Sequence, residues 1–137
     1  MEASAPVGGA SSVPWTEVSP APGRGEIWSV RIPGQPDDPH QPRPALVVSA
    51  DVRNQIADDL MVVPIFSQGA VGPTHVRLAK GTGGIKRDSV LFCEELTTLD
   101  REFLSRGPWG PRVGADVLDA VNRGVRRSIG ETVPEPS

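Results

Sequence analysis

The sequence has little cysteine and no long apolar run. Cys93 is the only cysteine among 137 residues, so the chain cannot form an internal disulfide or a cysteine-based metal cluster. The apolar residues just before it predict a buried thiol in a strand. No segment approaches the roughly 18 apolar residues of a membrane helix, and no basic start precedes an apolar stretch at the N-terminus. We therefore expect a soluble, cytoplasmic protein without a membrane partner.

Regular apolar spacing is missing from both ends of the chain. Residues 1–23 are mostly alanine, serine, proline and glycine, and residues 131–137 have a similar character. Such segments bury too little apolar surface to fold on their own. We expect two disordered tails around one folded domain at 24–130.

An excess of one charge is also missing from the part expected to fold. The net charge of the chain is −3, but four of its 17 acidic residues lie in the predicted tails. Only Arg24 of the 14 basic residues lies outside 25–130, so this region is neutral. A neutral domain argues against bulk binding to duplex DNA, which needs a strongly basic face. A compact single-stranded nucleic-acid site built from a few arginines stays possible.

Short apolar segments, by contrast, are frequent. They predict strands at 26–32, 44–50, 60–66, 74–78 and 89–93. Pro64 interrupts the third of these strands, which predicts an edge position or a bulge there. Residues 51–59 fit either a helical turn or a loop. Closely spaced short strands indicate a small, strongly curved sheet or barrel.

Helical spacing appears only near the C-terminal end. Residues 115–129 carry one apolar stripe, and a short turn is expected at 100–104. The arginines of the helix lie off the stripe near its C-terminal end, which indicates a solvated face that the helix dipole favours. They are Arg123, Arg126 and Arg127. Gly124 costs a helix about 1 kcal/mol relative to alanine, so we expect close packing there against the sheet or a partner chain.

The most informative stretch begins at Arg43. A proline follows this arginine, and then an uninterrupted apolar run at 45–48 reads as a strand buried on both faces. Pro44 donates no N–H and pushes Arg43 toward an extended conformation. Arg43 is therefore a stiffly mounted cation at the rim of the core, with a surface role as the alternative. A guanidinium can bridge two phosphate oxygens, which lysine cannot match.

Ordered sequence pieces resemble a known family. They are RGEIW at 24–28, RPALVVS at 43–49, VVPI at 62–65, PTHV at 73–76 and DSVLFCEELTTLD at 88–100, extended by Phe103 and Leu104. Together they span nearly all of 24–130. In this order they resemble the MazF/PemK family of toxin endoribonucleases from type II toxin–antitoxin pairs.

The resemblance implies a mainly β fold with α, an SH3-like small β-barrel of five to seven strands with a C-terminal helix. It implies a homodimer that needs no metal or other cofactor and cleaves single-stranded RNA at a short sequence. The products would carry 2′,3′-cyclic phosphate and 5′-hydroxyl ends, and cleavage would inhibit translation and growth. A MazE-like antitoxin would neutralise the toxin by laying an extended segment into the RNA groove.

The resemblance also suggests catalytic residues. Arg43 occupies the family's catalytic arginine position, where charge stabilisation is its safest role. Phe66 stands where the family commonly has a threonine. Ser67 would supply the hydroxyl if a bulge at Pro64 shifted the strand end, or it simply begins a turn. His40, on a proline-rich loop, is suited to acid–base work near neutral pH or is plain surface.

Further residues are candidates for binding RNA. Gln68 and Thr74 are candidates by family position, and His75 either lines the groove or faces water. Glu94 and Glu95 follow a buried strand, where the family places acidic and amide groups near the groove. The alternative for this pair is a salt bridge with a nearby arginine at the rim.

Two other functions stay open. CcdB-like gyrase poisons share the fold, but they depend on a tryptophan-containing C-terminal end, and no tryptophan follows Ile129 here. A cleavage-deficient member that only binds RNA or antitoxin is the second alternative, because of Phe66.

Overall fold

A computed structural model describes residues 21–34, 37–38 and 41–136. The first predicted tail lies outside the described residues up to position 20. The elements follow in the order β1 (Ile27–Val30), β2 (Arg43–Val47), α2 (Asp51–Ile56), β3 (Asp59–Phe66), β4 (His75–Leu78), η1 (Thr82–Gly84), β5 (Ser89–Phe92), η2 (Cys93–Glu95), β6 (Thr97–Asp100), η3 (Arg101–Phe103), β7 (Leu104–Arg106) and α3 (Ala115–Ser128). None of the described helices is long and apolar enough to cross a membrane.

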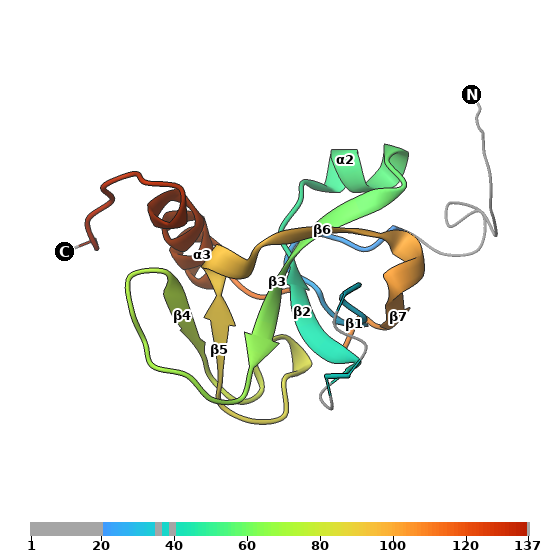
Figure 1. The fold of residues 1–137 in the computed structure, drawn as a ribbon, viewed down its shortest axis with the longest axis horizontal. Helices are drawn as coiled ribbons and strands as arrows, with labels where there is room; N and C mark the ends of the chain where they lie inside the picture. The colour runs from blue at the N-terminus through green and yellow to red at the C-terminus, as the bar shows by residue number, and fades with distance from the viewer. Residues whose placement is uncertain (1–20, 35–36, 39–40, 137) are drawn as a thin grey trace.

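Seven antiparallel strands make one sheet with α3 beside it (Figure 1). The strand order is β4-β5-β3-β2-β1-β7, and β6 pairs with β3. This confirms the predicted small β fold with a C-terminal helix. The sheet stays open rather than closing into a barrel, because β4 and β7 stand at opposite ends of the strand order.

β3 is the central strand, so the prediction of an edge or a bulge at Pro64 is wrong. Pro64 pairs with Ala45 of β2 without a shift of register. On its other side β3 pairs with β6 up to Val62 and with β5 from Ile65 onward. Pro64 thus lies where β3 changes partner, so the residue without an N–H coincides with a break between two ladders.

β2 is buried on both faces, as its unbroken apolar run predicted. Leu46 belongs to the core that α3 covers, together with Val63, Leu91 and Val121. A second core, toward β6 and β7, takes the neighbouring residues of β2 and β3; its members include Ala45, Val47, Val62, Leu99 and Leu104. The two cores fix β2 from both sides, and Arg43 is its first residue.

α3 packs against the turn that follows β5, which accounts for the glycine in its interior. A Cβ on Gly124 would lie 2.6 Å from Sγ of Cys93. The close packing predicted for Gly124 is thus confirmed, with the sheet side of the fold as its partner. Cys93 is buried as predicted, although in η2 rather than a strand, and burial raises the pKa of its thiol to about 11.

The arginines at the end of α3 contact the residues that follow the helix. Arg126 pairs with Glu131, and Nη1 of Arg127 lies 2.9 Å from Oε2 of Glu135. Arg127 also donates to the carbonyl oxygens of Val133 and Pro73. Residues 131–136 hold neither helix nor strand, and their predicted disorder stays a prediction.

Candidate functional site

Arg43 lies in a row of residues that crosses four strands. Val90 of β5 is opposite Phe66 of β3 and opposite Arg77 of β4. Extending the β2–β3 register by two residues from Ala45 and Pro64 brings Arg43 beside Phe66. Because directly opposed residues of antiparallel strands point to the same face, Arg43, Phe66, Val90 and Arg77 share one face of the sheet.

Several groups hold the guanidinium of Arg43. Its Cζ lies 4.1 Å from the centre of the Phe66 ring, a cation–π contact. Nη2 lies 2.9 Å from Oδ2 of Asp38, in the β1–β2 loop. Nη1 makes a longer contact of 3.5 Å with the carbonyl oxygen of Ile65. The residue is only 8% exposed, so this cation is mounted firmly at the rim of the core.

Aromatic rings continue from Arg43 across the same face. The Phe66 and Phe92 ring centres are 4.3 Å apart, and His75 stacks on Phe92 with centres 4.1 Å apart. Phe92 and His75 are directly opposed in the β4–β5 register, two residues from Val90 and Arg77. We call Arg43, Phe66, Phe92 and His75 the cation–aromatic ladder. Its two ends carry groups that can bear positive charge.

His75 contacts an acceptor at each ring nitrogen. Nδ1 lies 2.6 Å from the carbonyl oxygen of Ala70, and Nε2 lies 2.9 Å from Oε2 of Glu94. Only an imidazolium can donate to both. The bond to Ala70, and then the bond to Glu94, raise the pKa of His75 above its ordinary value of 6.5. When protonated, His75 thus ties the loop at Ala70 to Glu94.

Glu94 is the second half of this tie. Partial burial pushes the pKa of its carboxyl upward, but hydrogen bonds from His75, the backbone and Thr74 outweigh burial and leave the pKa below its ordinary value. Thr74 donates its hydroxyl to Oε1 of Glu94 at 2.9 Å. Three of the predicted RNA-binding residues, Thr74, His75 and Glu94, therefore form one hydrogen-bonded cluster. The salt-bridge alternative for Glu94 named an arginine as partner, whereas the partner in the structure is His75.

The loop 67–74 folds over the ladder. Gly69 has a φ of +153°, and a Cβ there would lie 2.7 Å from the ring of Phe92. The bond from His75 to Ala70 fixes the same loop. Ser67 and Gln68 are both exposed on it. His75 and Phe92 thus determine how this loop presents the two polar side chains.

The remaining predicted site residues lie apart from these contacts. The bulge that would bring Ser67 toward Arg43 is absent, and Ser67 makes no hydrogen bond within the described residues, so its catalytic role stays a prediction. Glu95 is exposed beside Glu94 and raises the pKa of His75 slightly. His40 lies outside the described residues. No three His, Cys, Asp or Glu side chains cluster as metal ligands in the described part of the chain.

Sequence reasoning missed Asp38 and the ladder role of Phe66 and Phe92. The Asp37–Asp38 pair, shortly before Arg43, was the available signal for a carboxylate partner. The contact between Phe66 and Phe92 depends on strand register over long sequence distances, which one sequence does not reveal. Phe66 stands where a hydroxyl was expected, and its ring stacks on Arg43 instead.

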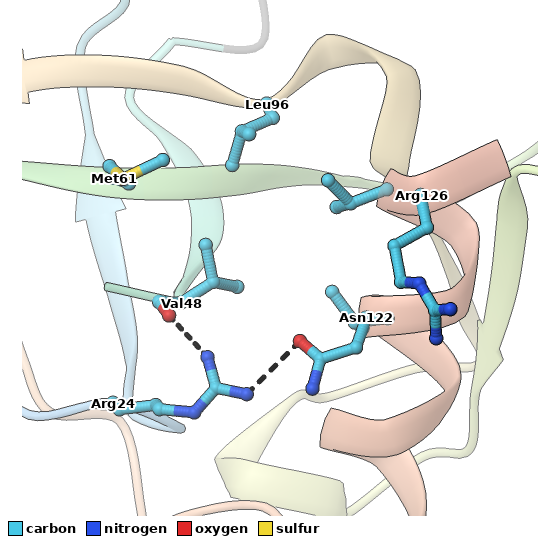
Figure 2. A pocket seen from close by; sticks show the side chains of 8 residues that line it. Arg24, Val48, Met61, Leu96, Asn122 and Arg126 are labelled. Carbon is cyan, nitrogen blue, oxygen red and sulfur yellow. Dashed lines mark hydrogen bonds between the residues drawn. The ribbon is translucent and has the colours of Figure 1, made fainter. Parts of the chain in front are cut away.

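A separate groove of about 340 Å³ lies between α3 and β2–β3 (Figure 2). Arg24 crosses it: one guanidinium nitrogen donates to the carbonyl oxygen of Val48, and Nη2 lies 3.1 Å from Oδ1 of Asn122 on α3. None of the predicted site residues lines this groove. We interpret Arg24 as a structural link that holds α3 beside the strands.

Comparison with known proteins places these features in a family context. Residues 23–129 match the family described as PemK-like, MazF-like toxin of type II toxin–antitoxin system. Endoribonuclease EndoA of Bacillus subtilis (strain 168) is 35% identical over 65 residues, which are 46% of this chain and 56% of that protein. The match thus spans little more than half the length of that relative.

Solved structures share the fold. An endoribonuclease in complex with its cognate antitoxin from Mycobacterial species superposes with a TM-score of 0.66 at 19% identity, over 83% of this chain and all of that chain (100%). MazF (Form-I) from Deinococcus radiodurans gives 0.66 at 23% identity, over 81% of this chain and 98% of that one. Both likenesses support the overall fold described above.

Proposed function

Because the chain belongs to the PemK-like, MazF-like toxins of type II toxin–antitoxin systems, we propose that it is an endoribonuclease toxin. Its substrate is single-stranded RNA, which it cuts at a short sequence without a metal ion. The observation that carries this proposal is the placement of Arg43: its guanidinium is buried and stacks on the ring of Phe66, the last residue before the exposed part of the loop 67–74. The name of the Bacillus subtilis relative supports the same activity.

The proposed reaction uses the RNA's own 2′-hydroxyl. Its oxygen attacks phosphorus and loses its proton to a base, while the bond from phosphorus to O5′ breaks. O5′ takes up a proton, which leaves a 2′,3′-cyclic phosphate and a 5′-hydroxyl end. Arg43 stabilises the negative charge that develops on the phosphorus oxygens, since its donors are fixed before substrate arrives.

The base that accepts the 2′-hydroxyl proton must lie close to Arg43. Asp38 is the acid–base side chain that contacts Arg43 within the described residues, so we assign it this role. Its carboxylate also occupies one edge of the guanidinium, so bound phosphate takes the other edges or moves Asp38 aside. Ser67 and His40 are the alternative proton-transfer groups.

The RNA-binding residues divide into two kinds. Gln68 and Glu95 are exposed and free to contact bases. His75, Glu94 and Thr74 are bonded to one another, so their proposed role is to hold the loop 67–74 in its place over the ladder. The sequence that is cut would then depend on this loop.

We further propose a homodimer and a cognate antitoxin as partners. The complex of the Mycobacterial endoribonuclease with its antitoxin supports the second of these. An antitoxin that lays an acidic, extended segment over Arg43 would block the phosphate site directly. Neutralisation by this contact would explain how toxin activity and growth are controlled.

The test is cleavage of mixed single-stranded RNA by the purified protein in excess EDTA. The proposal predicts cyclic-phosphate ends at a recurrent short sequence, and their disappearance with Arg43→Ala. RNA binding without cleavage would instead identify a cleavage-deficient member, which the phenylalanine at position 66 motivates. A break in DNA that depends on gyrase would favour the CcdB-like alternative.

A further inference from the structure

Exposed basic side chains gather in the connection between β4 and β5. Arg77, Lys80, Lys86 and Arg87 are all exposed, and none of their side chains makes a hydrogen bond or ion pair with the described residues. Asp88 is the only acidic residue in 77–88. Its carboxylate accepts a hydrogen bond from the backbone N–H of Lys80 at 2.9 Å. The segment therefore keeps an excess of positive charge.

Most other basic side chains have acidic partners. Arg53 pairs with Asp59, Arg112 with Asp51, and the α3 arginines with Glu131 and Glu135. Arg31 and Arg106 are also exposed and without such a partner among the described residues, but they lie at the β1–β7 end of the sheet. Although the folded region is neutral as a whole, its unpaired positive charge is thus concentrated at 77–88.

This segment lies at the same end of the sheet as Arg43. The β4–β5 connection follows Leu78 and precedes Ser89, next to the end of β3 at Phe66 and the start of β2 (Figure 1). Arg43 and Arg77 stand at the two ends of one cross-strand row. Three strand spacings separate them, about 14 Å, which is farther than one phosphate group can bridge.

We propose that Arg77, Lys80, Lys86 and Arg87 form a basic track for the backbone of single-stranded RNA that extends from the scissile phosphate at Arg43. The inference rests on the proposed function and adds a substrate requirement to it. RNA must reach several nucleotides past the cut on one side to be bound tightly. Between the two ends of the row lies Phe66, a partly exposed ring of the kind on which bases stack.

The positive charges favour the phosphodiester backbone of a nucleic acid as the ligand of the track. Each phosphate that a basic side chain neutralises releases counterions, which steepens the fall of log affinity with log salt by about 0.7 for single strands. Flexible exposed lysines and arginines suit such contacts, because they need charge rather than one fixed geometry. The track thus supplies affinity, while Arg43 supplies catalysis.

The experiment compares a long and a short RNA that contain the same cut site. The track variants are Arg77→Ala/Lys80→Ala and Lys86→Ala/Arg87→Ala, and Arg31→Ala/Arg106→Ala is the control with the same change of charge. The track variants should raise KM for the long RNA about tenfold and leave kcat unchanged. The short RNA and the control variant should show the unmodified constants.

Binding is measured separately, so that failure of cleavage does not hide the answer. Arg43→Ala protein, with and without the track substitutions, is titrated with labelled long RNA by fluorescence anisotropy at several salt concentrations. The track predicts a salt slope that becomes shallower by about 0.7 for each phosphate that the variant no longer neutralises. An unchanged salt slope overturns the proposal, as do equal effects of the track substitutions on long and short RNA. If the track substitutions weaken binding of the antitoxin's acidic segment but leave RNA binding unaffected, the proposal is also overturned. Absent cleavage with an intact track effect would refute the proposed function alone.

Discussion

The α3 side of the molecule and the face that carries the cation–aromatic ladder differ in how they hold their basic side chains. On the α3 side, Arg126 and Arg127 are neutralised by the residues that follow the helix. On the ladder face, Arg43 pairs with Asp38 but also stacks on the ring of Phe66, and Arg77 is unpaired within the described residues. We infer that the paired arginines on the α3 side serve stability, whereas the ring-stacked Arg43 and the unpaired Arg77 can meet an anionic ligand.

The α3 side is also packed more tightly than the ladder face. Gly124 lies so close to Cys93 that α3 tolerates no added atom there. On the ladder face, Phe66 and Phe92 are only partly buried, although rings of this size usually gain most by full burial. We therefore expect substitutions on the α3 side to change stability and substitutions on the ladder face to change catalysis.

Arg43→Lys is expected to have the largest effect on the ladder face. It keeps the charge but removes the planar fork and the stacking on Phe66. We expect kcat to fall about 100- to 1,000-fold, the effect of removing one preorganised charge-stabilising donor. Single-turnover cleavage with excess enzyme measures this decrease, and a full rate with lysine would show that charge alone suffices.

Phe66→Leu tests whether the ring positions Arg43. The side chain stays apolar, but the face that carries the guanidinium is removed, so we expect kcat to fall about 10- to 100-fold with KM little changed. Phe66→Tyr keeps the ring and is the matched control. If Phe66→Thr cleaves RNA faster than the natural protein, a hydroxyl at position 66 contributes more to catalysis than the ring does.

Gly124→Ala tests the close packing of α3. Alanine favours helices, yet its Cβ would lie 2.6 Å from Sγ of Cys93. Overpacking should outweigh propensity and lower the free energy of unfolding by about 1 to 3 kcal/mol, with the cleavage rate unchanged at a temperature where both proteins are folded. Urea unfolding measures the change, with Asp119→Ala at an exposed helical position as the control. A stabilised variant would contradict the packing described here.

The tie between His75 and Glu94 predicts a pH window for stability. Since the pKa of His75 is raised, its contribution is complete below its ordinary value of 6.5 and is lost as pH rises through the folded-state pKa. The pKa of Glu94 is lowered, so its contribution is present above 4.5 and is lost as pH falls through the folded-state pKa. The stability difference between the natural protein and His75→Gln should thus be largest between these values.

Urea unfolding across this pH range checks the window. The difference between the two proteins should shrink as the solution becomes alkaline. A difference that does not change with pH would show that stacking on Phe92, rather than the charged tie, sets the contribution of His75.

Glu135→Gln should have the smallest effect. Glu135 pairs with Arg127 at 2.9 Å, but its side chain is 70% exposed, and such pairs contribute less than about 1 kcal/mol. We expect a small decrease in thermal stability that disappears at high salt, and no change in cleavage. A large decrease would show that residues 131–136 are an integral part of the fold.

The sequence was sufficient to predict what depends on local pattern. An unbroken apolar run placed β2 between two cores, and Pro44 placed Arg43 at its rim. Gly124 indicated close helix packing. β6 and β7 were missed, because each is short and carries one buried apolar residue, Leu99 or Leu104, which gives no alternation to recognise.

Partners across strands could not be predicted in the same way. Pro64 suggested an edge, yet β3 is central. A proline is accommodated there because β3 changes its pairing partner from β6 to β5 at that residue. The stacking of Arg43 on Phe66 depends on a register between distant segments, and the bond to Asp38 depends on how the β1–β2 loop folds back. From the sequence alone, Phe66 is interpreted as the loss of a hydroxyl side chain, because the sequence does not show what its ring contacts.

We propose that the ladder face is the catalytic site and that Arg43 is its catalytic residue. The most direct measurement is the single-turnover rate of RNA cleavage in EDTA by Arg43→Ala, with Gly124→Ala measured beside it and the unfolding midpoint of each recorded. We expect a rate about 1,000-fold lower for Arg43→Ala in a folded protein, and a normal rate with a lower midpoint for Gly124→Ala. Cleavage at the natural rate by folded Arg43→Ala would contradict it.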